Sequence, residues 1–162
     1  PIIAADAKAG LRAVLTLAEG VCRDTMSGMP YPVAASLSLG DQTYSGCGGD
    51  PMDLFAEIDW QVTALGDTAL VPDAPATIRF GRDGRISGTG GCNRLMGGFD
   101  LTGEGLRLGD GVASTMMACP DQIMAQEAAL FDALAEVTGF DIDADGALIL
   151  RGPDGPLITA MR

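Results

Sequence analysis

The most reactive side chains of this chain belong to four cysteines, Cys22, Cys47, Cys92 and Cys119. Four cysteines allow three disulfide pairings, and their spacing separates an N-terminal pair from a C-terminal pair. We therefore predict one bridge between Cys22 and Cys47 and another between Cys92 and Cys119. Structural zinc is the competing use, but zinc sites draw on closely spaced cysteines or on histidines, and the sequence offers neither.

The predicted bridges also indicate a compartment. Disulfides persist in oxidising surroundings, of which the bacterial periplasm is the simplest, so we expect a periplasmic or cell-envelope protein. Two alternatives stay open. The cysteines are buried free thiols in a cytosolic protein, or Cys92 and Cys119 form a reactive redox pair.

The chain contains no histidine. This removes the usual general base near neutral pH, the usual member of a catalytic triad and the commonest metal ligand. Ser114 and Thr115 have no base beside them in the sequence, so nucleophilic catalysis by either is not expected. We predict no enzymatic activity, no cofactor and no bound metal.

A glycine-rich segment at residues 88–91, Gly-Thr-Gly-Gly, precedes Cys92. Glycines let backbone N–H groups approach an anion, as they do in phosphate-binding loops. A phosphate loop, however, opens directly into a helix and carries Lys followed by Ser or Thr. Here further strands are expected, so we interpret these glycines as a tight bend with close backbone packing.

Glu127 lies beside apolar positions of a predicted helix, on or next to its buried face. A carboxylate placed there needs hydrogen-bond donors. We predict that Glu127 bonds to Arg94, to Asn93 or to backbone N–H groups of the glycine bend, as a structural clasp. The functional alternative is a buried acid with a raised pKa.

Leu95, Met96 and Met116 surround the predicted Cys92–Cys119 bridge. Methionine fills cores and also makes adaptable contacts with ligands. We single out these three residues as a candidate apolar contact surface for a lipid or peptide, with core packing as the alternative.

Ten basic residues stand against 22 acidic ones, a net charge of −12. Such a charge repels phosphate backbones and anionic lipid surfaces, so nucleic acid is not an expected partner. The chain also lacks an apolar run of 18 residues, and we expect no transmembrane segment. It begins at Pro1, which fits a processed start from which an export signal has been removed.

The elements that must position these residues are mostly short strands. We expect a strand over residues 11–21 and one long helix over residues 121–138, followed by three strands. We expect another single strand at residues 60–65, which opens the second unit. The remaining strands form three turn-linked hairpins, over residues 33–39 and 42–47, 76–80 and 85–88, and 97–101 and 105–108. This order predicts a mainly β (α+β) fold, an antiparallel barrel-like or strongly curved sheet packed on one late helix.

Residues 58–162 resemble the META/HslJ family of small bacterial envelope and heat-shock domains. The resemblance rests on Trp60, on Gly-Gly-Cys-Asn-Arg at 90–94, on Thr-Met-Met-Ala-Cys at 115–119 and on the helix with Glu127, Phe131 and Leu134. It implies a compact β-barrel-like fold with a late helix, and no catalytic residues.

Residues 1–57 are predicted to form a separate small β-hairpin unit. Their Cys22–Gly28 and Tyr44–Gly49 segments resemble the closing half of an uncharacterised envelope lipoprotein-type domain, so we expect a fragment of a longer precursor. For the whole chain we expect a non-enzymatic, disulfide-stabilised envelope module linked to stress tolerance or protein binding. Its partner is an unknown envelope protein or a small apolar ligand; an inhibitor or lipid- or peptide-binding barrel and a thiol redox protein are the alternatives.

Overall fold

The computed structural model describes residues 3–6, 13–109 and 111–162 of the 162-residue chain. The chain divides into two compact units, Pro1–Leu54 and Phe55–Arg162, which we call the N-terminal unit and the C-terminal unit. The sequence placed the boundary near residue 57.

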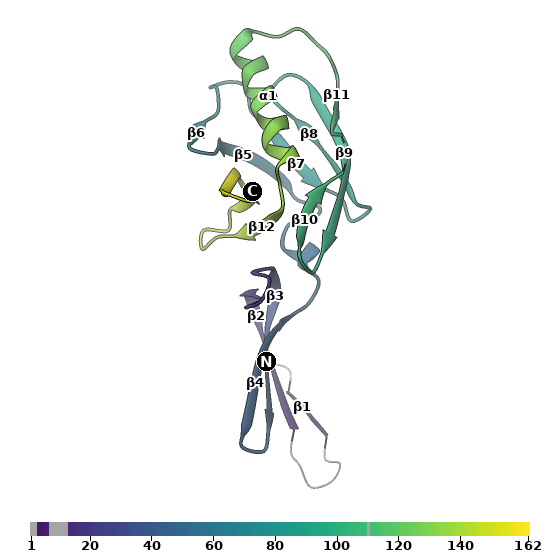
Figure 1. Cartoon of the computed structure of the whole chain (residues 1–162), viewed down its shortest axis with the longest axis vertical. Coiled ribbons are helices and arrows are strands. Elements are labelled where there is room, and N and C mark those ends of the chain that lie inside the picture. The colour runs from purple at the N-terminus through teal and green to yellow at the C-terminus, as the bar shows by residue number, and fades with distance from the viewer. Residues whose placement is uncertain (1–2, 7–12, 110) are drawn as a thin grey trace. The chain divides into compact units, whose positions relative to one another are not determined.

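The N-terminal unit is a four-stranded antiparallel sheet (Figure 1). Its strands follow one another in the sheet in chain order, and a turn at Gly40 and Asp41 joins the last two, as the sequence predicts. The expected strand at 11–21 corresponds to the second strand, although residues 11 and 12 lie outside the described residues. The elements are β1 (Ile3–Asp6), β2 (Ala13–Arg23), β3 (Pro30–Leu39), β4 (Gln42–Gly48) and the 3-10 turn η1 (Pro51–Leu54).

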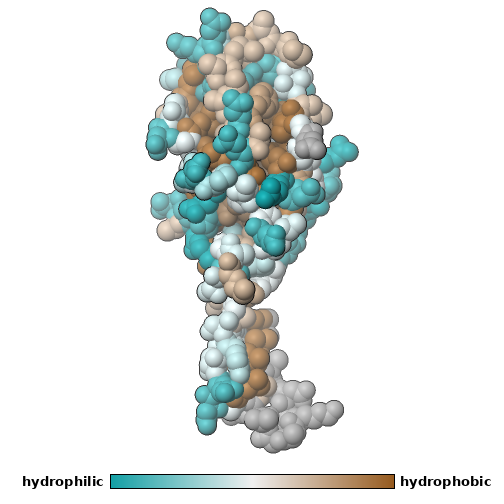
Figure 2. Space-filling model, in the orientation of Figure 1, coloured by the Kyte–Doolittle hydropathy of each residue, from teal (hydrophilic) through white to brown (hydrophobic). Residues whose placement is uncertain are grey.

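The two faces of this sheet differ in polarity. Strand pairing places Leu15, Leu37 and Tyr44 in one row across β2, β3 and β4, and Thr16 and Ser36 in the adjacent row. Directly paired residues share a face and successive residues alternate, so one face is apolar and the other carries hydroxyl groups. Figure 2 shows apolar residues at the surface of this unit.

The C-terminal unit is a ten-stranded antiparallel sheet with one helix. The sheet order is β10-β9-β8-β7-β5-β14-β13-β12, with β6 paired to β5 and β11 paired to β9. The elements are β5 (Asp59–Leu65), β6 (Thr68–Ala69), β7 (Thr77–Phe80), β8 (Arg85–Thr89), β9 (Arg94–Thr102), β10 (Gly105–Leu108), β11 (Ala113–Ser114), α1 (Asp121–Ala135), β12 (Gly139–Ile142), β13 (Leu148–Gly152) and β14 (Gly155–Met161).

The sheet curves around α1, which contacts β5, β10 and β14 (Figure 1). The first long strand, β5, pairs with the last strand, β14. Among the described residues no ladder joins the end strands β10 and β12, so the sheet is strongly curved and is not a closed barrel. The predicted mainly β fold with one late helix is confirmed.

Helix α1 is three residues shorter than the sequence predicts. It ends at Ala135, and the N–H of Glu136 closes its last turn on the carbonyls of Ala133 and Leu134. Thr138 then donates its N–H to the carbonyl of Arg151 on β13 at 2.8 Å. This bond draws the chain into the sheet before the helix can continue.

The core of the C-terminal unit lies between α1 and the inner face of the sheet. Its centre includes four phenylalanine rings, with centroids of Phe55 and Phe140 4.5 Å apart and those of Phe80 and Phe99 5.2 Å apart. Such ring pairs add stabilisation beyond the area that they bury. The largest fully buried side chains are Trp60, Phe55, Phe80, Ile78, Ile86, Leu95, Leu106, Leu130, Leu134, Leu148, Leu150 and Ile158.

Candidate functional site

The polar side chains buried among the described residues, Asn93, Gln126 and Glu127, lie where α1 meets the glycine bend between β8 and β9. We call them the buried polar cluster. Helix periodicity explains the placement: Gln126, Leu130 and Leu134 repeat every four residues and so share one stripe that faces the core. The folding of an amphipathic helix onto this sheet therefore carries two polar groups inside.

The Glu127 carboxylate accepts hydrogen bonds from the glycine bend. Its Oε1 accepts the backbone N–H of Cys92 at 2.9 Å and the backbone N–H of Asn93. Its Oε2 accepts the Asn93 side-chain amide at 2.8 Å. The helix is thus tied to the bend by three donors.

Asn93 extends this network to the segment between β11 and α1. Its Nδ2 donates to the carbonyl of Met117 at 3.2 Å, and its Oδ1 accepts the N–H of Met117 at 2.7 Å. The same Oδ1 accepts the hydroxyl of Thr115 at 2.9 Å. All hydrogen-bonding capacity of the Asn93 amide is therefore used within the protein.

Gln126 connects α1 to a third segment, the loop between β6 and β7. Its Nε2 donates to the carbonyls of Ala74 and Gly90, both at 2.9 Å, and its Oε1 accepts the N–H of Val71 at 2.6 Å. Gln126 was not among the residues predicted from the sequence to form a site. Its position four residues before Leu130, on the buried stripe, was the signal that it enters the core.

The glycines of the bend are required by the buried polar cluster. A Cβ on Gly90 would come within 2.6 Å of Cγ of Glu127. Gly91 has φ +120°, and a Cβ there would approach Nε2 of Gln126 to 3.0 Å. The segment is a close-packed bend against α1, which is the interpretation that the sequence favoured over a phosphate loop.

The electrostatics of Glu127 are those of a stable carboxylate. Burial raises its pKa, but the hydrogen bonds from the Asn93 side chain and from the N–H groups of Asn93 and Cys92 outweigh this, and the pKa is lowered overall. A buried general acid would need the opposite shift. The arrangement therefore holds structure together and does not supply a proton near neutral pH.

Both disulfides are present, between Cys22 and Cys47 and between Cys92 and Cys119. Their Cα atoms are 5.5 and 6.5 Å apart, within the range that a disulfide spans. The second bridge joins the glycine bend to the segment that Asn93 also holds. That segment is therefore fastened twice.

The other residues that the sequence singled out do not act together. Arg94 makes no hydrogen bond or ion pair to Glu127 among the described residues, and its backbone N–H bonds to Thr115 instead. Leu95 is buried in the core, whereas Met96 and Met116 are 61% and 96% exposed. The expectation that Leu95 belongs to a contact surface is wrong, because consecutive strand residues point to opposite faces.

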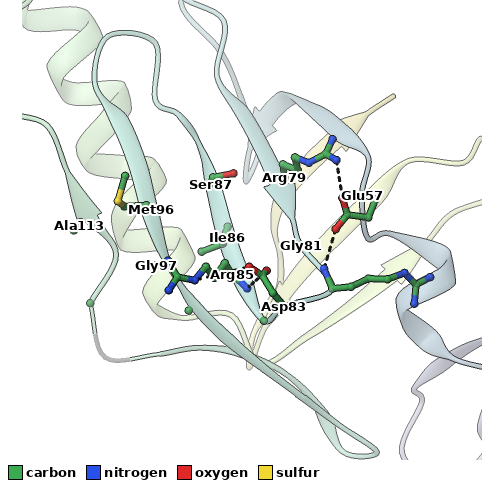
Figure 3. Close-up of a pocket in the computed structure, with 14 residues that line it drawn as sticks. Glu57, Arg79, Gly81, Asp83, Arg85, Ile86, Ser87, Met96, Gly97 and Ala113 are labelled. Carbon is green, nitrogen blue, oxygen red and sulfur yellow. Dashed lines mark hydrogen bonds and ion pairs between the residues drawn. The ribbon is translucent and has the colours of Figure 1, made fainter.

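The outer face of β7, β8 and β9 carries a groove next to Met96 (Figure 3). At one side, the Glu57 carboxylate accepts Nη2 of Arg79 at 2.7 Å and the N–H of Arg82 at 2.9 Å. Arg79 also donates to Asp59 at 3.1 Å. The bonds from Arg82 and Arg79 lower the pKa of Glu57, so this carboxylate is charged near neutral pH.

The described residues contain no group of three or more His, Cys, Asp or Glu side chains arranged to hold a metal ion. No helix in the described part of the chain is both long enough and apolar enough to cross a membrane.

Comparisons with known proteins place this architecture in a family. A model of the META domain matches residues 53–162. An NMR structure of a protein from Burkholderia xenovorans is 27% identical, with a TM-score of 0.56, over 72% of this chain and 92% of that one. No curated protein matched the chain. The family model covers the curved sheet, α1 and the buried polar cluster, and the chain therefore belongs to the META domain family.

Proposed function

We propose that this protein is a non-enzymatic module of the bacterial cell envelope that acts by binding another protein, in support of stress tolerance. The observation that carries the proposal is the contrast between its closed interior and its exposed thioethers. The polar groups that chemistry would use, on Asn93 and Glu127, are committed to structural hydrogen bonds. Met96 and Met116, in contrast, are exposed to solvent, and Met116 lies in the segment that the Cys92–Cys119 bridge holds.

Exposed methionines suit a binding role. The thioether side chain is flexible and polarisable, so it adapts to different apolar partners. The segment that carries Met116 is fastened by Asn93 and by the disulfide, so its side chain is presented from a fixed backbone. A fixed backbone lowers the entropy lost on binding.

The envelope location is supported by the two disulfides, because reducing compartments keep such cysteines as thiols. Intact mass and peptide mapping of the protein from its native compartment, with and without reductant, test this. Both bridges should be present and should resist mild reductant. Free thiols would contradict the location, and a readily opened Cys92–Cys119 bridge would favour thiol redox chemistry.

Binding is tested by photo-crosslinking in cells exposed to heat. A benzophenone amino acid replaces Met116 in one variant and Met26 in a control variant, because both side chains are 96% exposed but lie in different units. We expect a discrete crosslinked protein from position 116 and none of the same size from position 26. Equal or absent crosslinking at the two positions would contradict a specific contact surface at Met116.

A further inference from the structure

The groove on the outer face of β7, β8 and β9 has a volume of about 950 Å³. Its centre lacks large side chains: strand pairing places Ser87 beside Arg79 on one side and beside Met96 on the other. Ala113 follows Met96 in the same row. Figure 3 shows this row, with Met96 and Ala113 on one side of Ser87 and Arg79 on the other.

The charge of the groove differs from that of the chain. Three arginines line it, Arg79, Arg82 and Arg85, with two carboxylates, Glu57 and Asp83. The whole chain instead has 10 basic residues against 22 acidic ones. Asp59, which pairs with Arg79 from outside the groove, brings the local balance to three basic and three acidic groups. The groove is therefore a nearly neutral spot on an acidic protein, and an anionic group approaching the molecule is repelled less there than over most of its surface.

The guanidinium groups of Arg79 and Arg85 are not equivalent. Arg79 is held by Glu57 and Asp59 at 2.7 and 3.1 Å. The Arg85 side chain is 81% exposed, and its contact with Asp83 is 3.8 Å long, between two solvated groups. Such a pair contributes little, so Arg85 can exchange Asp83 for a ligand carboxylate at small cost.

We propose that this groove binds an extended acidic peptide segment of a partner protein, with a carboxylate on Arg85 and a neighbouring apolar side chain on Met96. This rests on the proposed binding function and names the chemistry of the partner. A guanidinium takes a carboxylate in a two-pronged arrangement, and the small residues along Ser87 and Ala113 leave room for a peptide backbone. Met96, 61% exposed, supplies adaptable apolar contact.

The alternation of a strand gives this peptide its pattern. In an extended chain, side chains that point to one side recur every second residue, about 7 Å apart. An acidic residue and an apolar residue separated by one small residue therefore reach the groove together. The net charge of −12 limits the acidic segment to a few carboxylates, because a long polyanion is repelled by the rest of the surface.

Fluorescence anisotropy with two labelled peptides tests the proposal on the full chain. The acidic probe is Gly-Glu-Gly-Leu-Gly-Glu-Gly, and the control probe has Lys in place of Glu. Each is titrated with the wild type, with Arg85→Glu and with Arg151→Glu. Arg151 is an exposed arginine of β13 that lies outside the groove. Because both variants replace an arginine by a glutamate, they change the net charge equally.

We expect the acidic probe to bind more tightly than the basic probe, and Arg85→Glu to weaken it about tenfold, the effect of turning one exposed attraction into a repulsion. Arg151→Glu should change its affinity less than about twofold, since separated exposed charges are screened. Thermal unfolding shows whether each variant is folded, and Arg85→Gln replaces Arg85→Glu if that variant is not.

Equal effects of Arg85→Glu and Arg151→Glu would overturn the groove assignment, as would equal binding of the two probes. Failure of the acidic probe to bind below about 1 mM, a weak limit for a few exposed contacts, would overturn it as well. Each of these results leaves the Met116 crosslink unaffected. Loss of that crosslink, in turn, would overturn the proposed function.

Discussion

The two units of this protein use the same element, a curved or twisted antiparallel sheet, in different ways. In the C-terminal unit α1 covers the inner face of the sheet, and large side chains such as Trp60 and Phe55 are fully buried. In the N-terminal unit, Met29 and Pro30 are the buried residues within 13–54. The paired apolar residues Leu15 and Leu37 are only half-buried.

This difference in side-chain burial indicates that the hydrogen bonds of a sheet alone do not make a stable unit. Burial of apolar surface is the main source of stability, and a single uncovered sheet buries little of it. The C-terminal unit obtains stability from its core and from the buried polar cluster. We expect the N-terminal unit, which has fewer buried side chains, to depend more on its Cys22–Cys47 bridge.

The distribution of aromatic residues allows the units to be followed separately. The single tryptophan, Trp60, belongs to the C-terminal unit, and the two tyrosines, Tyr31 and Tyr44, belong to the N-terminal unit. Tryptophan fluorescence therefore reports one unit and the tyrosine signal the other.

The largest effect is expected from removal of a core ring. Phe55→Ala should lower the free energy of unfolding of the C-terminal unit by about 4 kcal/mol, because it deletes a fully buried ring and leaves a cavity. Denaturant titration followed by Trp60 fluorescence measures this. Tyr44→Ala, at a side chain 52% exposed, should cost less than about 1 kcal/mol by the tyrosine signal. Similar losses at the two positions would remove the contrast between the units.

Glu127→Ala should cost the C-terminal unit about 3 kcal/mol, because it leaves the Asn93 amide and two backbone N–H groups without their acceptor. Asp132→Ala, at an exposed position of the same helix, is the matched control and should change stability by less than about 0.5 kcal/mol. Unchanged stability in Glu127→Ala would show that the buried polar cluster does not stabilise the fold.

The two disulfides should differ in consequence, although each closes a loop of similar length. Chain-entropy models assign about 3.5 kcal/mol to each, for sequence separations of 25 and 27 residues. Replacing Cys22 and Cys47 by Ser should abolish the cooperative tyrosine transition. Replacing Cys92 and Cys119 by Ser should only lower the midpoint of the Trp60 transition, because the Asn93 amide still bonds to both the N–H and the carbonyl of Met117. Loss of both transitions in the second variant would contradict this.

The smallest effect is the acid sensitivity contributed by Glu127. Its pKa in the folded state lies below the ordinary value of 4.5, so the folded state binds this proton less tightly than the unfolded state. Its stabilisation is complete above about pH 4.5 and is lost as the pH falls through the folded pKa. Between neutral pH and about pH 3, the Trp60 transition of Glu127→Gln should decline less steeply than that of the wild type. Parallel declines would assign the acid sensitivity to other carboxylates.

Much of the fold follows from local sequence signals. The turn at residues 82–84 and the alternation in residues 85–88 predict the β7–β8 hairpin, because turn chemistry and strand periodicity act between near neighbours. The end of α1 was placed three residues too late. Local propensity does not include the bond from Thr138 to Arg151, which lies on a strand formed later in the chain.

The candidate site divides in the same way. The approach of Glu127 to Asn93 could be predicted, since a carboxylate beside a buried stripe needs donors. The bonds of Gln126 to Val71 and Ala74 could not, because these partners lie in a loop more than 50 residues away. The groove on the outer face of β7, β8 and β9 arises from strand register, which brings Met96 beside Ser87.

The pairing of β5 with β14 has a consequence for the timing of folding. These strands lie near the two ends of the C-terminal unit, at residues 59–65 and 155–161. Contacts between such distant residues are costly to form and slow the search for the native state. On the ribosome, β5 emerges long before its partner, so the ladder between β5 and β14 forms only after β14 has been synthesised, whereas the β7–β8 hairpin forms between near neighbours.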